Sequence, residues 1–192
     1  AIHLALATGR KAFYTTPIKA LSNQKFHEFS RRWGPERVGL LTGDTSVNSE
    51  ADVVVMTTEV LRNMLYGGSS TLANLGFVVM DEVHYLADRF RGAVWEEVII
   101  HLPPAVQLIS LSATVSNAEE FGDWLEQVRG NQEVIVSEHR PVPLWQHMQV
   151  GPRMFDLFAD STAGPRLDGG IPRLNPHLSD AIRQAEQRGY AE

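Results

Sequence analysis

Short apolar runs alternate along this chain with longer segments that have the spacing of helices. The runs are three to six residues long and rich in β-branched side chains, which is typical of strands. They occupy residues 12–15, 38–41, 53–56, 77–80, 106–111 and 134–136. Strands separated by helices form repeated β-α-β units, and such units build a parallel sheet with helices on both faces. We therefore predict an α/β fold with three layers and a mainly parallel sheet.

The helical segments are recognised by apolar residues three and four positions apart and by residues that start or stop helices. The expected helices are 1–8, 17–29, 57–65, 92–101, 116–125 and 178–188. Gly9 should end the first of them, and Pro17 should begin the second. A further extended segment is expected over 144–150.

Two adjacent carboxylates, Asp81 and Glu82, directly follow the apolar run 77–80. In nucleoside-triphosphate motors one such carboxylate holds a magnesium ion, and the other polarises the water that attacks the terminal phosphate. Residues 112–114 follow the next run, so both clusters should lie at one edge of the sheet. Taken alone, an acidic pair in this place is as often a solvated turn, and a lone histidine such as His84 is more often structural.

Three more polar clusters follow expected strands, at 15–21, 42–44 and 57–59. The first and third open helices, whose initial N–H groups lack partners within the helix and suit a phosphate. Lys19 adds positive charge to the first. Such clusters along one edge can hold a nucleic-acid strand by its backbone without reading bases. The alternative for each segment alone is an ordinary loop between a strand and a helix.

Charge is distributed unevenly, which bears on this interpretation. The net charge is −6, but residues 1–40 hold seven Lys or Arg against two Glu. A basic first part on an acidic body is typical of a phosphate-facing edge, although a solvated helix face has the same composition. The chain has no cysteine, which suits a cytoplasmic protein, and no apolar run long enough to cross a membrane.

The loop that cradles phosphates in many nucleotide-binding proteins, G-x-x-x-x-G-K-[ST], does not occur in this sequence. The first residue is alanine, and residues 1–8 have the character of the second half of a helix. We therefore interpret the chain as a piece of a larger protein that starts just after such a loop. A domain is expected over residues 1–150. A linker or tail is expected over 151–192, where glycine and proline interrupt every pattern.

Seven segments in order resemble a known family. They are TTPIKALSNQK (15–25), LTGD (41–44), VMTTEVLRNML (55–65), MDEVHY (80–85), RGAVWEE (91–97), LSAT (111–114) and HRPVPL (139–144). Together they resemble the superkiller-type, exosome-associated DExH-box RNA helicases of helicase superfamily two. Residues 148–158 are similar to the actinobacterial HelY-type members. The resemblance covers residues 1–158.

The resemblance implies a RecA-like domain that closes with a second one around ATP, Mg²⁺ and single-stranded RNA, and moves along the strand in the 3′-to-5′ direction. It implies that Asp81 holds Mg²⁺ through water, that Glu82 is the general base, and that His84 belongs to the same catalytic group. Coupling between nucleotide and strand is implied for His84, Ser112 and Thr114. The residues implied for the nucleic-acid path, mainly through their backbone, are Pro17, Lys19, Ala20, Thr42, Gly43, Thr57 and Thr58. An RNA-degradation complex is the implied partner.

Two elements of the family pattern are missing, the phosphate loop and the second domain with its arginine finger. Loss of such a finger alone lowers turnover by about 10³-fold or more, so this chain by itself should be inactive. Two other functions stay open at this point. One is a DNA-repair helicase of the same superfamily, since backbone contacts do not identify the sugar. The other is a catalytically dead nucleic-acid-binding module.

Overall fold

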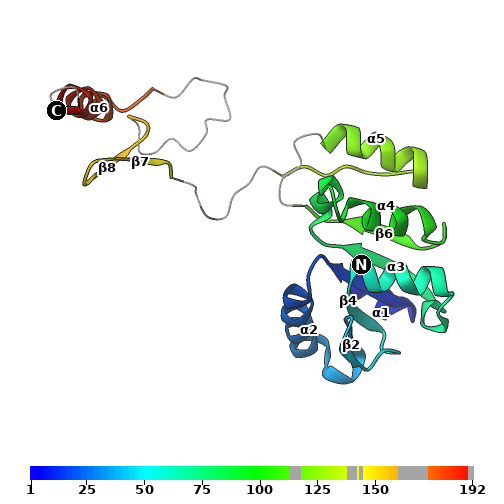
Figure 1. Ribbon diagram of the computed structural model, residues 1–192. Helices are drawn as coiled ribbons and strands as arrows, with labels where there is room; N and C mark the ends of the chain where they lie inside the picture. Colours follow the sequence, from blue (N-terminus) through cyan, green and yellow to red (C-terminus); the bar gives the residue numbers. More distant parts are fainter. Residues whose placement is uncertain (113–117, 138–141, 143–144, 160–172, 190–192) are drawn as a thin grey trace. The chain divides into compact units, whose positions relative to one another are not determined.

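Figure 1 shows the structure, a computed structural model that describes residues 1–112, 118–137, 142, 145–159 and 173–189. The chain divides into two compact units, Ala1–Val134 and Ile135–Glu192, and each is described by itself. The expected division into a domain over 1–150 and a linker or tail over 151–192 stays a prediction.

The larger unit is built on a six-stranded sheet with the strand order β3-β2-β4-β1-β5-β6. Strands β2, β4, β1, β5 and β6 run parallel, and β3 pairs antiparallel with β2. The strands are β1 Lys11–Thr16, β2 Val38–Leu41, β3 Ser46–Val47, β4 Val53–Thr57, β5 Leu75–Met80 and β6 Gln107–Ser110. The predicted mainly parallel α/β sheet is confirmed.

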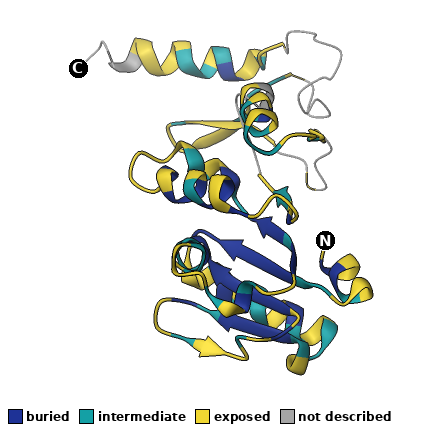
Figure 2. Ribbon diagram, turned by 90° about the vertical axis from the view of Figure 1, so that its right-hand side faces the viewer, coloured by how far each residue is buried: buried dark blue, intermediate teal, exposed yellow. Residues whose placement is uncertain are grey.

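Helices cover both faces of this sheet. On one face lie α1 (Ile2–Thr8) and α2 (Lys19–Trp33), whose apolar side chains join those of β1, β2 and β4 in one core cluster. On the other face lie α3 (Thr58–Gly67), α4 (Gly92–His101) and α5 (Ala118–Arg129), packed over a second core cluster. Short 3₁₀ helices complete the unit at η1 (Pro35–Arg37), η2 (Ser70–Leu72) and η3 (Val83–Ala87). Figure 2 shows the buried strands between these partly exposed helices.

The register of the strands places their carboxyl ends at one edge. Five residues lie in a single row across the sheet, because each pairs with the next on the neighbouring strand. In sheet order they are Leu41, Met56, Thr15, Met80 and Ser110. The residues that follow this row, one group after each parallel strand, must therefore lie side by side along the edge.

Two of the elements expected in this unit differ in the structure. Residues 134–136 form no strand, and Ile135 is 82% exposed. These residues are β-branched, which is typical of strands. The preference of such residues for strands comes from packing against neighbouring strands, and no described strand pairs with this segment. The second helix begins at Lys19 and not at Pro17, since Ile18 is still extended with φ −143°.

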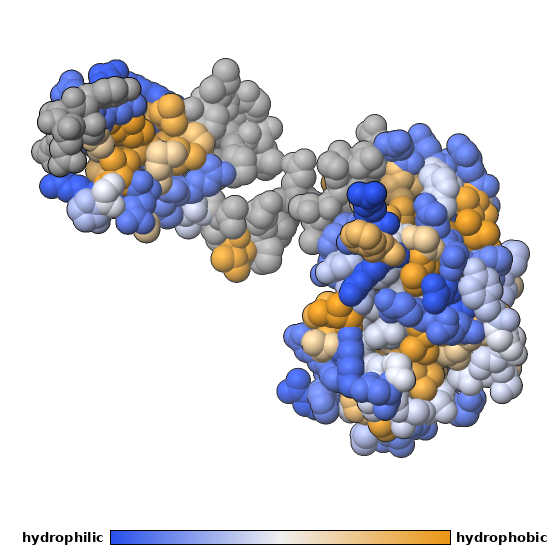
Figure 3. Space-filling model, in the orientation of Figure 1, coloured by the Kyte–Doolittle hydropathy of each residue, from blue (hydrophilic) through white to orange (hydrophobic). Residues whose placement is uncertain are grey.

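The smaller unit contains a hairpin and a helix. Strands β7 (His147–Val150) and β8 (Arg153–Asp156) pair antiparallel, and α6 (Pro176–Gly189) contacts both. Leu178 is buried in this unit, and Figure 3 shows hydrophobic residues gathered between the hairpin and the helix. The expected C-terminal helix is confirmed. The extended segment expected over 144–150 is a strand over 147–150, and residue 144 lies outside the described residues. Strand β8 was not expected.

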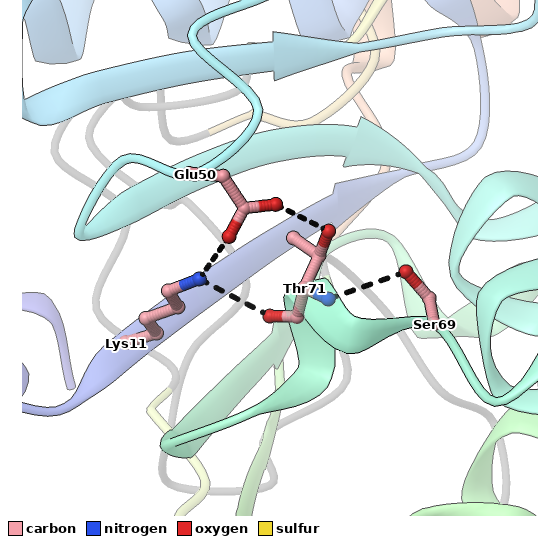
Figure 4. A network of polar contacts seen from close by, with 4 residues as sticks. All are labelled: Lys11, Glu50, Ser69 and Thr71. Carbon is pink, nitrogen blue, oxygen red and sulfur yellow. Dashed lines mark hydrogen bonds and ion pairs between the residues drawn. The ribbon is translucent and has the colours of Figure 1, made fainter.

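A network of polar contacts joins three strands at the edge opposite their carboxyl ends (Figure 4). Lys11 Nζ lies 2.7 Å from Glu50 Oε2, and the Thr71 hydroxyl donates to Glu50 Oε1 at 2.6 Å. Lys11 also donates to the Thr71 carbonyl at 3.4 Å, and the Thr71 N–H donates to Ser69 Oγ at 3.3 Å. Lys11 begins β1, Glu50 precedes β4 and Thr71 precedes β5, so the network ties these strands together.

Glu50→Gln is expected to lower stability in a pH-dependent manner. The hydrogen bond from Lys11, followed by that from Thr71, lowers the pKa of Glu50 below its ordinary value of 4.5. A carboxyl group whose pKa is lower in the folded state stabilises the fold above its unfolded pKa and loses that effect as the pH falls. Urea midpoints should therefore separate wild type from variant at pH 7 and approach each other as the pH falls below the ordinary value of 4.5 and through the lowered pKa of Glu50.

The exposed residue Glu133 offers the matched control, because it lies outside this network. Glu133→Gln should leave the urea midpoint unchanged at both pH values. A Glu50→Gln midpoint equal to that of wild type at pH 7 would show that the network does not stabilise the fold.

Candidate active site and nucleic-acid path

The candidate site residues lie along the carboxyl edge of the sheet. Following the strand order from β2 to β6, the edge carries residues 42–44, then 57–58, 17–19, 81–84 and 111–112. The two groups expected to act on a nucleotide are neighbours, because β5 and β6 are paired. The three groups expected to contact nucleic acid form the other half of the same edge.

Asp81 is held in place from two sides. The Tyr14 hydroxyl donates to its Oδ2 at 2.7 Å, and the Glu82 N–H donates to its Oδ1 at 3.0 Å. The Asp81 backbone continues the sheet, since its N–H donates to the Thr15 carbonyl at 2.9 Å. Each carboxylate oxygen has two lone pairs, so each retains one for another partner. Tyr14 was not predicted as a site residue, because it lies within an apolar run.

Glu82 has an unusual backbone conformation. Its φ of 54° and ψ of 46° lie in the left-handed region, which costs a residue other than glycine about 1–2 kcal/mol. Two hydrogen bonds hold the turn: the Glu82 N–H donates to Asp81 Oδ1, and the Val83 N–H donates to the Leu111 carbonyl at 2.8 Å. Glu82 Oε2 lies 3.3 Å from His84 Nδ1, and both side chains are partly exposed. Strain of this kind is concentrated at functional sites, where surrounding contacts maintain it.

The end of β6 is joined directly to this turn. The Leu111 N–H donates to the Met80 carbonyl at 2.9 Å, and its own carbonyl accepts from Val83. Ser112 is therefore placed beside Asp81 and Glu82, and it is exposed. Thr114 lies outside the described residues. The structure thus brings together four of the five residues expected for catalysis and coupling.

The residues expected on the nucleic-acid path differ in exposure. Lys19, Ala20 and Gly43 are exposed, whereas Pro17, Thr42, Thr57 and Thr58 are buried. The hydroxyls of two of the buried threonines have partners within the protein. Thr58 donates its hydroxyl to the Thr16 carbonyl at 3.3 Å, and Thr42 donates to Asp44 Oδ1 at 3.0 Å.

The N-terminus of α2 is the most accessible part of this path. Within the completely described helix α2 and its flanking residues, no side chain caps the N-terminus. The exposed residues Lys19 and Ala20 begin the helix, so their N–H groups have no partner within it. Lys19 forms an ion pair with Asp44, which comes from the loop after β2. The first cause of the lowered pKa of Asp44 is its hydrogen bond from Lys19, and the second is that from Thr42.

Two features are absent from the described part of the chain. None of its His, Asp and Glu residues form a group of three that could hold a metal ion on their own. None of its helices is long and apolar enough to cross a membrane.

Comparison with known proteins agrees with this geometry. Residues 1–121 match the sequence profile of the family described as DEAD/DEAH box helicase. The chain belongs to this helicase family. The resemblance to DExH-box helicases stated above is confirmed.

Curated relatives place the chain more closely within the family. It is 68% identical over 190 residues to "Probable helicase HelY" of Mycobacterium leprae, covering 98% of this chain and 21% of that protein. It is 50% identical over 145 residues to "Antiviral helicase SKI2" of Saccharomyces cerevisiae, covering 75% and 11%. The chain therefore spans about a fifth or less of the length of these relatives.

A solved structure shows the same fold at low sequence identity. The DUF1998 helicase MrfA, solved bound to DNA and AMPPNP, matches with a TM-score of 0.57 and 24% identity, covering 71% of this chain and 22% of that one. At this identity the likeness establishes the fold alone, and it confirms the expected RecA-like architecture.

Proposed function

We propose that this chain is part of an ATP-dependent RNA helicase, which couples Mg-ATP hydrolysis to 3′-to-5′ movement along single-stranded nucleic acid. The observation that carries the proposal is one sheet edge that combines the Asp81–Glu82 turn with the exposed N-terminus of α2. A relative 52% identical over 191 residues is named "DExH-box ATP-dependent RNA helicase DExH15 chloroplastic", from Arabidopsis thaliana, which favours RNA. That match covers 96% of this chain and 16% of the relative.

Asp81 fits a magnesium ion. Mg²⁺ prefers oxygen ligands and usually keeps several waters, taking one or two carboxylates together with phosphate oxygens. A single half-buried carboxylate with one lone pair free on each oxygen suits that pattern, including contact through water. When bound, the ion would neutralise the charge that develops on the phosphates. The role of Asp81 is to hold it at the end of β5.

Glu82 is proposed as the general base. Glu82 directly follows Asp81, the proposed metal ligand, at the end of β5, and its backbone is in the left-handed conformation. A carboxylate in this place accepts the proton of the attacking water. His84 contacts Glu82, and Ser112 is tied to the same turn through Leu111. We propose that His84 and Ser112, with Thr114, link the state of the nucleotide to the strand.

The nucleic-acid path is proposed over Pro17, Lys19 and Ala20 at β1, Thr42 and Gly43 at β2, and Thr57 and Thr58 at β4. Thr42 and Thr58 would contact the strand through their backbone and not through their hydroxyls. Each hydroxyl already donates a hydrogen bond within the protein, to Asp44 and to the Thr16 carbonyl respectively. Phosphate contacts of this kind position a strand without reading its bases.

Asp44→Asn is expected to tighten binding of single-stranded RNA by the intact protein. The change removes the negative charge that pairs with Lys19 and keeps an acceptor for Thr42. Lys19 would then be available to one phosphate. We expect about a two- to fivefold gain in affinity at low salt, and a salt slope of log K steeper by about 0.7. Fluorescence anisotropy across a salt series measures both.

A double-mutant comparison supplies the control. In a Lys19→Gln background the Asp44→Asn change should have no effect on affinity, since the lysine that it releases is gone. Weaker binding in the single Asp44→Asn variant would contradict the assignment of Lys19 to the path.

We further propose that residues 1–192 alone turn over little ATP, because the sequence lacks the phosphate loop and a second RecA-like domain. In the intact protein the second domain would close over the carboxyl edge. An RNA-degradation complex is the proposed partner, in keeping with the similarity to a superkiller-type helicase. We place its action in the cytoplasm, which agrees with a sequence without cysteine.

ATP turnover by the intact protein, measured in parallel with single-stranded RNA and single-stranded DNA, tests the proposal. Stimulation by RNA well above that by DNA is the expected result. Equal or stronger stimulation by DNA would favour a DNA-repair helicase, and no turnover with either would leave a binding module. Unwinding of duplexes with a 3′ or a 5′ overhang then tests the direction, with the 3′ overhang expected to be required.

A further inference from the structure

Tyr14 is a buried residue whose hydroxyl reaches the carboxyl edge. Its side chain lies on the α2 face of the sheet, in the core cluster shared with that helix. The Phe29 ring packs edge-on against it, with centroids 5.0 Å apart and an interplanar angle of 86°. Lys25 Nζ lies 5.9 Å from the Tyr14 centroid. These contacts leave the ring little freedom, so its hydroxyl has a fixed position.

Within the described residues, the Tyr14 hydroxyl is the one side-chain group that donates to the Asp81 carboxylate. It donates to Asp81 Oδ2 at 2.7 Å, while Oδ1 accepts the backbone N–H of Glu82. The two donors fix both oxygens and therefore the plane of the carboxylate.

We propose that Tyr14 is a positioning residue, which orients the Asp81 carboxylate toward the divalent cation of the nucleotide site. Groups behind a metal ligand orient it, and their loss typically lowers metal affinity by about 10- to 100-fold. This inference rests on the proposed function, because it takes Asp81 as the metal ligand.

The same contact joins the two halves of the edge. Tyr14 belongs to β1, and two residues later the Thr16 hydroxyl donates to the Ile18 carbonyl at 3.0 Å. Thr16 also contacts Ser22 Oγ at 2.7 Å inside the first turn of α2. The strand that leads to the proposed phosphate-binding N-terminus of α2 therefore also carries the group that orients Asp81.

The test compares Tyr14→Phe with wild type in the intact protein. Binding of Mn²⁺, a spectroscopic substitute for Mg²⁺, is followed by electron paramagnetic resonance in the presence of a non-hydrolysable ATP analogue. The variant should bind Mn²⁺ about tenfold more weakly or worse. The Mg²⁺ concentration for half-maximal turnover should rise in parallel, and saturating Mg²⁺ should restore kcat to within a few-fold of wild type.

Two further variants separate positioning from folding. Tyr66→Phe removes the hydroxyl of an exposed tyrosine on α3 and should leave Mn²⁺ affinity unchanged. Phe29→Leu keeps the Tyr14 hydroxyl but loosens its ring, and a smaller loss of affinity of about two- to threefold is expected. Circular dichroism melts check that each variant is folded.

The outcomes distinguish this inference from the proposed function. Equal Mn²⁺ affinity in folded Tyr14→Phe and wild type would overturn the positioning role while leaving ATP hydrolysis intact. Wild type that binds Mn²⁺ with nucleotide but hydrolyses no ATP would overturn the proposed function, and a Tyr14→Phe loss of affinity would still support the positioning role. Wild type that binds no Mn²⁺ with nucleotide would overturn both.

Discussion

Glu82→Gln in the intact protein is expected to lower RNA-stimulated ATP turnover by about 10³-fold, because general-base catalysis contributes about 10²- to 10⁴-fold. Glutamine has the same shape and can keep the contact to His84, so the left-handed turn and the hydrogen bonds around it should persist. The amide cannot accept a proton from the attacking water. Nucleotide and RNA affinities should stay within about threefold of wild type if the role of Glu82 is confined to this step. Steady-state phosphate release and anisotropy titrations measure the two effects separately.

Glu96→Gln is the matched control, since Glu96 is exposed on α4 and outside the candidate site. It should leave turnover unchanged. Turnover by Glu82→Gln within tenfold of wild type would exclude Glu82 as the general base. Clear turnover by residues 1–192 alone that disappeared in the same variant would contradict the expected inactivity of this chain.

Gly92→Ala is expected to destabilise the larger unit by about 3 kcal/mol, toward the upper end of what overpacking costs. Gly92 begins α4 and is buried, and a Cβ there would lie 2.2 Å from the Leu86 carbonyl oxygen. The obstacle is backbone and not the end of a flexible side chain, so the 3₁₀ helix η3 would have to move. Because η3 carries His84, turnover should fall as well. Urea unfolding gives the stability change, and phosphate release gives the loss of activity.

Gly67→Ala provides the control for the glycine change itself. Gly67 ends α3, and a Cβ there would meet no atom within 4 Å. Alanine should leave stability unchanged or raise it by up to about 1 kcal/mol. A Gly92→Ala protein as stable and as active as wild type would show that η3 and α4 do not pack as closely as described.

The sheet was predictable because its central strands are buried on both faces. The run 53–56 is apolar at every position, whereas a strand with one face in solvent would alternate apolar and polar residues. This run forms the interior strand β4. The order of apolar runs and helical segments then placed the carboxyl ends at one edge, and with them Asp81, Glu82 and Ser112. The family resemblance assigned roles to these residues that strand patterns alone do not define.

Other features depend on contacts distant in sequence and were not predictable. Tyr14 is separated from Asp81 by 67 residues in the sequence. Because it lies within an apolar run, the sequence pattern predicts only a core side chain at this position. The left-handed conformation of Glu82 is followed directly by the hydrogen bond between Val83 and Leu111, which are 28 residues apart in the sequence. Gly151 was interpreted as an interruption of structure, but its φ of 58° forms the turn between β7 and β8.

The network of Lys11, Glu50 and Thr71 lies at the amino edge of the sheet, on the opposite side from every candidate site residue. This separation has an evolutionary consequence. Descendants of such a domain could adapt to heat, salt or acidity by exchanging residues at one rim, and diversify their substrates at the other, with few substitutions serving both purposes. Thermal tolerance and enzymatic specialisation would then be inherited as independent traits of a single sheet.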